Sequence, residues 1–332
     1  MVVVDGHGGY VPLYRVDRRD VADQHGGRAS GESAVPARDE NHVTMACEAA
    51  ATALARSAAD AAEVDAVLSA SVTDPFAEHG IAAQVAYRLD ATGDVRTGDF
   101  RSSRRAVTDA LGAAAAFATG GETVLLVAVD VLPADPDDDG SPTAGAGAGA
   151  LLLRSDADGP VATLLASGRE TSGFVEHHRE HGSVAETGDA RFERRHGVAP
   201  AVESAVGRVL DGSETEPERA VAGAPDTRMA STAVGEVDAD HVSHREAVGD
   251  AGTASFALDL VAAFETSDPG TSVLGVNYGG GGADALLFET GPGADRTDGL
   301  SVAELLDAKE YVSYARHLEY REPVEYEGVS GA

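Results

Sequence analysis

The sequence predicts an α/β fold of five layers, α/β/α/β/α, with an internal duplication into two similar halves. Two observations predict it: one order of elements occurs twice, and the strands in that order are apolar without polar alternation. Such strands are buried on both faces of a sheet, so helices must cover both faces. We expect a first half at 1–168 and a second half at 169–332, forming one compact pseudo-twofold unit.

The first copy begins with an Ala-rich helix at about 104–118, which Gly120 and Gly121 end. A buried strand at 123–129 follows, then a glycine and alanine run at 145–149 and a second strand at 150–153. In this fold such glycine runs are expected to form tight turns. The half also carries an earlier helix and strand, at 43–59 and 64–68.

The second copy repeats this order with different residues. Its helix, strand, glycine run and second strand are expected at 255–264, 272–276, 279–282 and 285–288, after an earlier helix and strand at 198–210 and 219–222. Because the repeat was found from apolar patterning alone, it supports the five-layered fold independently of any resemblance.

Charge limits the classes of partner. The chain has 56 Asp and Glu against 25 Lys and Arg, a net charge of −31, and Lys309 is its only lysine. In an acidic interaction protein or a disordered chain, the acidic residues are expected to cluster in one stretch of sequence. Here they are scattered among apolar segments. We therefore interpret them as a surface adapted to a salt-rich cytoplasm. Such a surface repels phosphate, which excludes nucleic acid as a partner.

Other signals are weak. No apolar run is long enough to span a membrane and the N-terminus lacks a signal-peptide pattern, so we expect a soluble, cytoplasmic protein. The single cysteine, Cys47, falls on the apolar face of a predicted helix and is interpreted as a buried, inert thiol. His177, His178 and His181 lack further ligands in sequence, so no metal site is predicted.

Several motifs resemble the archaeal hydroxymethylglutaryl-CoA synthases of the thiolase superfamily. They span nearly the whole chain: Gly9-Tyr10-Val11-Pro12, Asp39-Glu40, Asp74-Pro75-Phe76, Asp99-Phe100, the glycine runs, and 308–315. The resemblance implies a thiolase-like form of the fold above. It also implies acyl-CoA condensation by a Glu–Cys–His triad, in which a thiolate attacks the acyl-CoA and the other two residues assist proton transfer.

At the three triad positions, this sequence has residues of other types. Ser102 stands where the family has Cys, Gly223 where it has His, and Val72 where it has Glu. Ser102 is interpreted as the N-cap of the following helix, because a hydroxyl without a neighbouring base is a poor nucleophile. All three positions are therefore predicted to be inactive.

The resemblance also indicates where an acyl-CoA would lie. The backbone of Gly279, Gly280 and Gly281 is expected beside the pantetheine channel, and Asp250 replaces an Asn of the family's Gly-Asn-Thr motif. No cofactor is required by this interpretation, and a coenzyme A thioester is left open as a ligand.

Three functions follow from these residues. The leading hypothesis is a non-catalytic, thiolase-fold subunit or scaffold of an acyl-CoA (thiolase and acyltransferase) assembly. The alternative is an active acyltransferase of the hydroxymethylglutaryl-CoA synthase type with displaced residues, using Ser102 or Ser103 with a histidine from 177–181. The third is a pure acyl-CoA binding module. The resemblance implies a homo- or heterodimer formed through the first-half sheet, with a thiolase and a small zinc-ribbon/OB-fold protein as partners.

Overall fold

The computed structural model describes residues 1–321 except 25–26, 135–139, 176, 181–184, 212, 214 and 236. Ten strands are hydrogen-bonded in the order β12-β11-β13-β14-β8-β1-β7-β6-β4-β5. Those of the first half are β1 (Val2–Tyr10), β4 (Ala66–Ser71), β5 (Arg96–Arg101), β6 (Val124–Val131) and β7 (Ala146–Arg154). Those of the second are β8 (Ala162–Thr171), β11 (Arg219–Gly223), β12 (Asp240–Val242), β13 (Ser272–Gly279) and β14 (Gly282–Thr290).

The strand order confirms the predicted duplication. Read outward from the β1–β8 pair, the first half runs β1-β7-β6-β4-β5 and the second runs β8-β14-β13-β11-β12. Directions repeat too: β6 is antiparallel to β7 and parallel to β4, as β13 is antiparallel to β14 and parallel to β11. The strands predicted at 123–129 and 272–276 are thus β6 and β13, at equivalent central positions. The division between 168 and 169, which falls within β8, stays a prediction.

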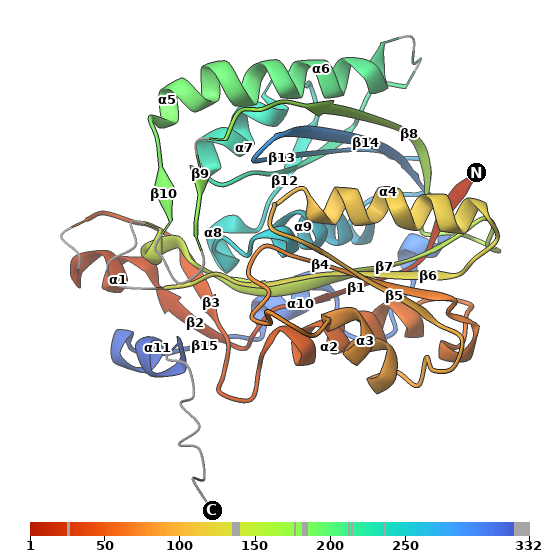
Figure 1. The fold of residues 1–332 in the computed structure, drawn as a ribbon, viewed down its shortest axis with the longest axis horizontal. Helices are drawn as coiled ribbons and strands as arrows, with labels where there is room; N and C mark the ends of the chain where they lie inside the picture. The colour runs from red at the N-terminus through yellow and green to blue at the C-terminus, as the bar shows by residue number, and fades with distance from the viewer. Residues whose placement is uncertain are drawn as a thin grey trace, which may run out of the picture.

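Helices form the other three layers (Figure 1). Between the two groups of strands lie α4 (Ala106–Thr119) and α9 (Thr253–Glu265), whose apolar residues share one core with both groups. On the outer face of the first half lie α2 (His42–Ala55) and α3 (Ile81–Arg88). On the outer face of the second lie α6 (Ala199–Leu210) and α7 (Thr227–Val234). The predicted five-layered α/β/α/β/α fold is confirmed.

The two glycine runs differ from each other. Residues 279–282 form the tight connection between β13 and β14, as predicted, with Gly281 at φ 92°. The run at 145–149 was expected to be a turn, but most of it lies inside β7. The reason is helix packing: a Cβ at Gly149 would lie 2.7 Å from the Cβ of Ala257 on α9. Glycine there allows the helix to approach the strand.

A smaller three-stranded sheet, β15-β2-β3, lies beside the main body. It comprises β2 (Tyr14–Asp17), β3 (Glu32–Val35) and β15 (Glu310–Tyr311), with α1 (Arg18–Gln24) and α11 (Tyr314–Arg321) nearby. The other elements are β9 (His177–His178), β10 (Glu186–Thr187), α5 (Ala190–Glu193), a π-helical turn at Arg194–Val198, α8 (Arg245–Val248), α10 (Val302–Asp307), and short 3₁₀ helices at Ala61–Glu63, Ser141–Thr143 and Pro292–Asp295. Within the described residues, no helix has the length and apolarity to cross a bilayer.

Candidate functional site

Ser102 lies in the turn that connects β5 to α4. Its side chain is exposed and its backbone is left-handed, with φ at 71°. The N-cap of α4 is Arg105, and the Oγ that accepts the N–H of Arg105, at 3.1 Å, belongs to Ser103. The prediction that Ser102 caps this helix was therefore wrong. The helix begins later than expected, so the neighbouring serine is the one within reach of its first N–H groups.

A buried ion network fills the region behind Ser102. Arg104 donates two hydrogen bonds of 2.6 Å to the two carboxylate oxygens of Asp250, and Arg245 lies 3.1 Å from the same carboxylate. Burial by itself would raise the pKa of Asp250, but the charges of Arg104 and Arg245 outweigh it and hold the pKa at about 2. Asp250, expected to contact an acyl-CoA, is thus a fully ionised partner of two guanidinium groups.

Gly223 ends β11 and faces the side chain of Asn277 on β13. A Cβ at Gly223 would lie 2.2 Å from Asn277 Oδ1 and 3.0 Å from the Cβ of Phe256. The Asn277 amide is itself held in place, because its Nδ2 donates to the carbonyl oxygen of Arg104 at 2.9 Å. A side chain at position 223 therefore requires Asn277 to move. The position at which the family has an imidazole is thus crowded by the side chains of Asn277 and Phe256.

Val72 follows β4, and its backbone N–H donates to Asp130 Oδ1 at 2.9 Å. Asp130 ends the apolar part of β6 and is fully buried. Its carboxylate accepts six hydrogen bonds, from Ser71 Oγ, the N–H of Val72, the N–H and Oγ1 of Thr73, and the N–H and Oγ1 of Thr253. The carboxylate near position 72 therefore joins the end of β4 to the start of α9, with its oxygens occupied.

The glycine hairpin packs against the start of α4. A Cβ at Gly279 would lie 3.1 Å from Ser103 Oγ, and the Gly281 carbonyl accepts a bond of 3.0 Å from Arg105. Arg105 also binds Asp284 through two bonds of 2.9 and 3.0 Å, and Arg169 lies 2.9 Å from Asp284. This second buried ion pair ties β14 and β8 to α4. A Cβ at Gly280 would meet only the two methyl groups of Val175, at 3.5 and 3.9 Å, so the side chain that faces this part of the hairpin is apolar.

The histidine segment follows residues 172–175, which contact the glycine hairpin. His177 and His178 form β9, paired with β10, and His178 Nε2 lies 3.7 Å from Glu186. His181 falls outside the described residues. Among the described residues, no group of three or more His, Cys, Asp and Glu is arranged to hold a metal ion.

Cys47 is half-buried on α2, and burial raises the pKa of its thiol.

Positions 72, 102 and 223 thus lie around one connected polar network. Its members that sequence reasoning missed are Arg104, Asp130, Asn277 and Asp284. Each of the last three is a polar residue whose neighbours on both sides are apolar or aromatic in a buried strand, which is a signal for a buried, partnered side chain. In the described network, Asp250 and Asp284 are each paired with arginine, and Asp130 accepts hydrogen bonds from Ser, Thr and backbone groups, so none of these three carboxylates is a free base.

Solved structures of other proteins share this architecture. MvaS in complex with 3-hydroxy-3-methylglutaryl coenzyme A superposes with a TM-score of 0.81, covering 97% of this chain and 92% of its own, at 21% identity. The 3-oxoacyl-(acyl carrier protein) synthase III, FabH, of Pseudomonas aeruginosa gives 0.75, covering 88% and 98%, at 23% identity. These likenesses show that the chain has the thiolase-like fold.

The related sequences narrow this class. The hydroxymethylglutaryl-CoA synthase of Methanothermobacter thermautotrophicus is 27% identical over 350 residues, covering 97% of this chain and 98% of that protein. That of Pyrococcus horikoshii is 26% identical over 349 residues, covering 96% of each. No protein-family model matches the chain. Over nearly its whole length, the chain is similar to the hydroxymethylglutaryl-CoA (HMG-CoA) synthases.

Proposed function

We propose that this protein is a non-catalytic, HMG-CoA synthase-like subunit or scaffold of an acyl-CoA-handling assembly in a salt-rich cytoplasm. One observation carries the proposal. Ser102, Gly223 and Val72 are the residues that the resemblance assigns to the triad positions, and the polar groups near them are already bound: Asp250 to Arg104 and Arg245, Asn277 to the Arg104 carbonyl, and Asp130 to the N–H of Val72.

The chemistry of the network supports this proposal. Condensation needs a nucleophile activated by a neighbouring base and a second group that moves a proton. A carboxylate whose pKa is about 2, as for Asp250, is a weak base. The guanidinium of Arg104 cannot accept a proton, since arginine is always charged in proteins. Loss of acid–base assistance alone lowers rates by about 10²–10⁴-fold.

A partner of this subunit would bind at a free sheet edge. β5 is the last strand of the first half and pairs with β4 on one side only, among the described residues. Arg96 and Thr97 on this strand are exposed. An open edge offers backbone N–H and C=O groups to another chain. A second copy, or a related thiolase-fold chain, pairing along β5 is the proposed dimer, and a thiolase and a zinc-ribbon/OB-fold protein are its proposed associates.

One observation favours the alternative function, an acyltransferase that uses Ser102. A left-handed backbone at a residue other than glycine costs about 1–3 kcal/mol, and such residues cluster at active sites. Ser102 is exposed at the start of α4, where a helix N-terminus stabilises negative charge. This alternative still needs a base, and the described contact of His178 is with Glu186 rather than with Ser102.

The test is a condensation assay with acetyl-CoA and acetoacetyl-CoA in molar KCl, comparing the wild type with Ser102→Ala. The proposal predicts no HMG-CoA above the uncatalysed background from either protein. Turnover that Ser102→Ala abolishes would replace the scaffold with the displaced-residue enzyme. Turnover that survives Ser102→Ala but is lost in Ser103→Ala would assign the displaced-residue enzyme to Ser103, and turnover that survives both substitutions would contradict both functions.

A further inference from the structure

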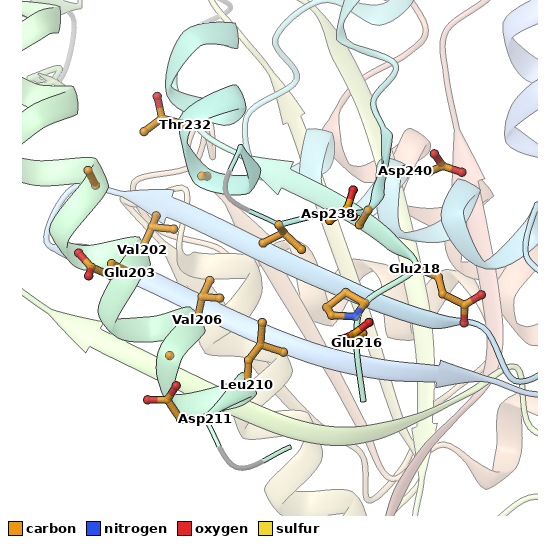
Figure 2. Close-up of a pocket in the computed structure, with 16 residues that line it drawn as sticks. Val202, Glu203, Val206, Leu210, Asp211, Glu216, Glu218, Thr232, Asp238 and Asp240 are labelled. Atoms are coloured by element: carbon orange, nitrogen blue, oxygen red, sulfur yellow. The ribbon is translucent and has the colours of Figure 1, made fainter. Parts of the chain in front are cut away.

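The outer face of the second half contains an open groove with a volume of about 900 Å³. Figure 2 shows Val202, Val206 and Leu210 of α6 along one wall. Glu216, Glu218, Asp238 and Asp240 lie across from them, in the segments that lead into β11 and β12. The groove lies outside the second-half strands, on the face opposite the central layer that holds the ion network.

The first half fills the equivalent place. There α3 packs against α2 and the strands. Its four packed side chains, none more than 4% exposed, are Ile81, Ala82, Val85 and Ala86. In the second half, α7 contributes only Thr232 and Ala233 to the groove wall. The two halves therefore differ in their outer helical layers. In the first half α3 packs against α2, whereas in the second half α7 leaves part of α6 uncovered.

The rim of the groove carries charge of one sign. Its six carboxylates are exposed: Glu203, Asp211, Glu216, Glu218, Asp238 and Asp240. The lining contains neither Lys nor Arg. In the described part of the chain, no ion pair involves any of the six, although buried aspartates elsewhere in the protein are paired with arginine. An apolar floor with an unpaired acidic rim is complementary to a basic, amphipathic partner.

We propose that this groove binds an amphipathic helix from another protein, with an apolar stripe flanked by lysine or arginine. Val202, Val206 and Leu210 recur at helical spacing over eight residues, about 12 Å, so the groove fits two to three turns of a helix. A second copy of this chain is a poor occupant of the groove, because with 25 Lys and Arg against 56 Asp and Glu it offers little basic surface to complement the acidic rim. The inference does not depend on whether the central network is catalytic.

The proposed interaction combines two forces. The apolar stripe buries Val206 and Leu210, which are half-buried without a partner. Basic flanks of the helix pair with the rim carboxylates and set its direction and specificity, while molar salt screens most of that attraction. Binding is therefore expected to weaken, but to persist, as KCl rises.

The test uses two fluorescently labelled peptides of about 15 residues with the same leucine stripe. One carries lysine and arginine flanks and the other carries glutamate. Anisotropy titrations are run at about 0.2 M and about 2 M KCl. The basic peptide is expected to bind at least about tenfold more tightly than the acidic one at the lower salt.

Gly207→Trp is the blocking variant. Gly207 lines the groove within α6, and a Cβ there meets only Asp211 Oδ2, at 3.5 Å, so the ring extends into the groove without disturbing the helix. Ala51→Trp is the matched control, at an exposed alanine on α2 in the first half. Gly207→Trp should weaken the basic peptide at least about tenfold, and Ala51→Trp should leave it unchanged.

Three results would overturn the proposal. They are equal binding of the acidic peptide, equal binding by Gly207→Trp, and displacement of the basic peptide by spermidine at matched charge concentration, which indicates a site for bare cations. Unfolding by Gly207→Trp would appear in circular dichroism. In that case a charge variant, Glu203→Gln with Asp238→Asn and Asp240→Asn, takes its place, with the same expected loss at low salt, because all three side chains are exposed.

Discussion

The carboxylates of the central network and those of the outer groove have opposite surroundings. Asp250 is 7% exposed and lies between Arg104 and Arg245, whereas Asp240 is exposed on the groove rim with no described ion pair. In the central network, the carboxylate charge of Asp250 is neutralised by the buried arginines. At the groove, the carboxylates are exposed to solvent, salt ions or a partner. Similar side chains should therefore respond very differently to salt, acid and substitution.

Salt gives the largest expected effect. The net charge of −31 is carried mainly by exposed carboxylates such as those of the groove, and their mutual repulsion is unscreened in dilute buffer. The melting temperature should rise markedly between low and molar KCl, as circular dichroism would record. Buried pairs such as Arg104–Asp250 are screened little, so they should not contribute to this rise. A melting temperature indifferent to KCl would remove the inference of a salt-rich cytoplasm.

Replacing one carboxylate in each region compares how much the central network and the groove contribute to stability. Asp250→Ala leaves the buried Arg104 without its carboxylate and should lower the free energy of unfolding by about 3–5 kcal/mol. The matched groove variant, Asp240→Ala, should change it by less than about 0.5 kcal/mol, because that side chain is exposed. Denaturant titrations in molar KCl measure both. Equal effects would show that the central pair is not a buried, structural interaction.

Acid should weaken the central pair. The pKa of Asp250 is lowered from 3.8 to about 2 in the folded protein, so the unfolded state takes up the proton first as pH falls. The stability from this group is complete above about pH 4 and disappears between about pH 4 and 2, a loss of about 2 kcal/mol. Asp250→Asn should flatten the stability profile in that window. An unchanged acid limb in the variant would contradict the assignment.

A smaller effect is expected at Gly223. Gly223→Ala places a Cβ 2.2 Å from Asn277 Oδ1 and should destabilise the fold by about 1–3 kcal/mol through overpacking. Adding Asn277→Ala should recover part of that loss, because it removes the obstructing amide. The control is Gly93→Ala, where nothing lies within 4 Å of the added Cβ and only the positive φ of 96° opposes it. Absence of coupling between 223 and 277 would show that the imidazole position is not blocked by Asn277.

The fold was predictable because the same order of apolar helices and strands occurs twice in the sequence, and this order determines both the layers and the order of strands in each half. β6 and β13 were both recognised as uninterrupted apolar strands, and the structure puts them at equivalent positions. The run at 145–149 was misjudged because glycine serves both turns and close helix packing, and only the approach of Ala257 decides between them. Similarly, whether Ser102 or Ser103 meets Arg105 depends on one left-handed residue, which composition does not reveal.

The site was predictable only as a set of positions. Ser102, Gly223 and Val72 came from motif resemblance, and their substitution was visible in the sequence. That Arg104 reaches Asp250, 146 positions along the chain, required the fold. The groove was also not predictable, since it depends on how far α7 lies from α6. Its apolar positions on α6 have the spacing of ordinary core residues.

The most direct test of the central claim is intact-mass spectrometry after incubation with acetyl-CoA in molar KCl. Formation of an acyl-enzyme needs an activated nucleophile, and Ser102 has no described base beside it. The account predicts an unmodified mass for the wild type. An acetyl adduct that maps to Ser102 or Ser103, and that disappears when the labelled serine is replaced by alanine, would contradict it.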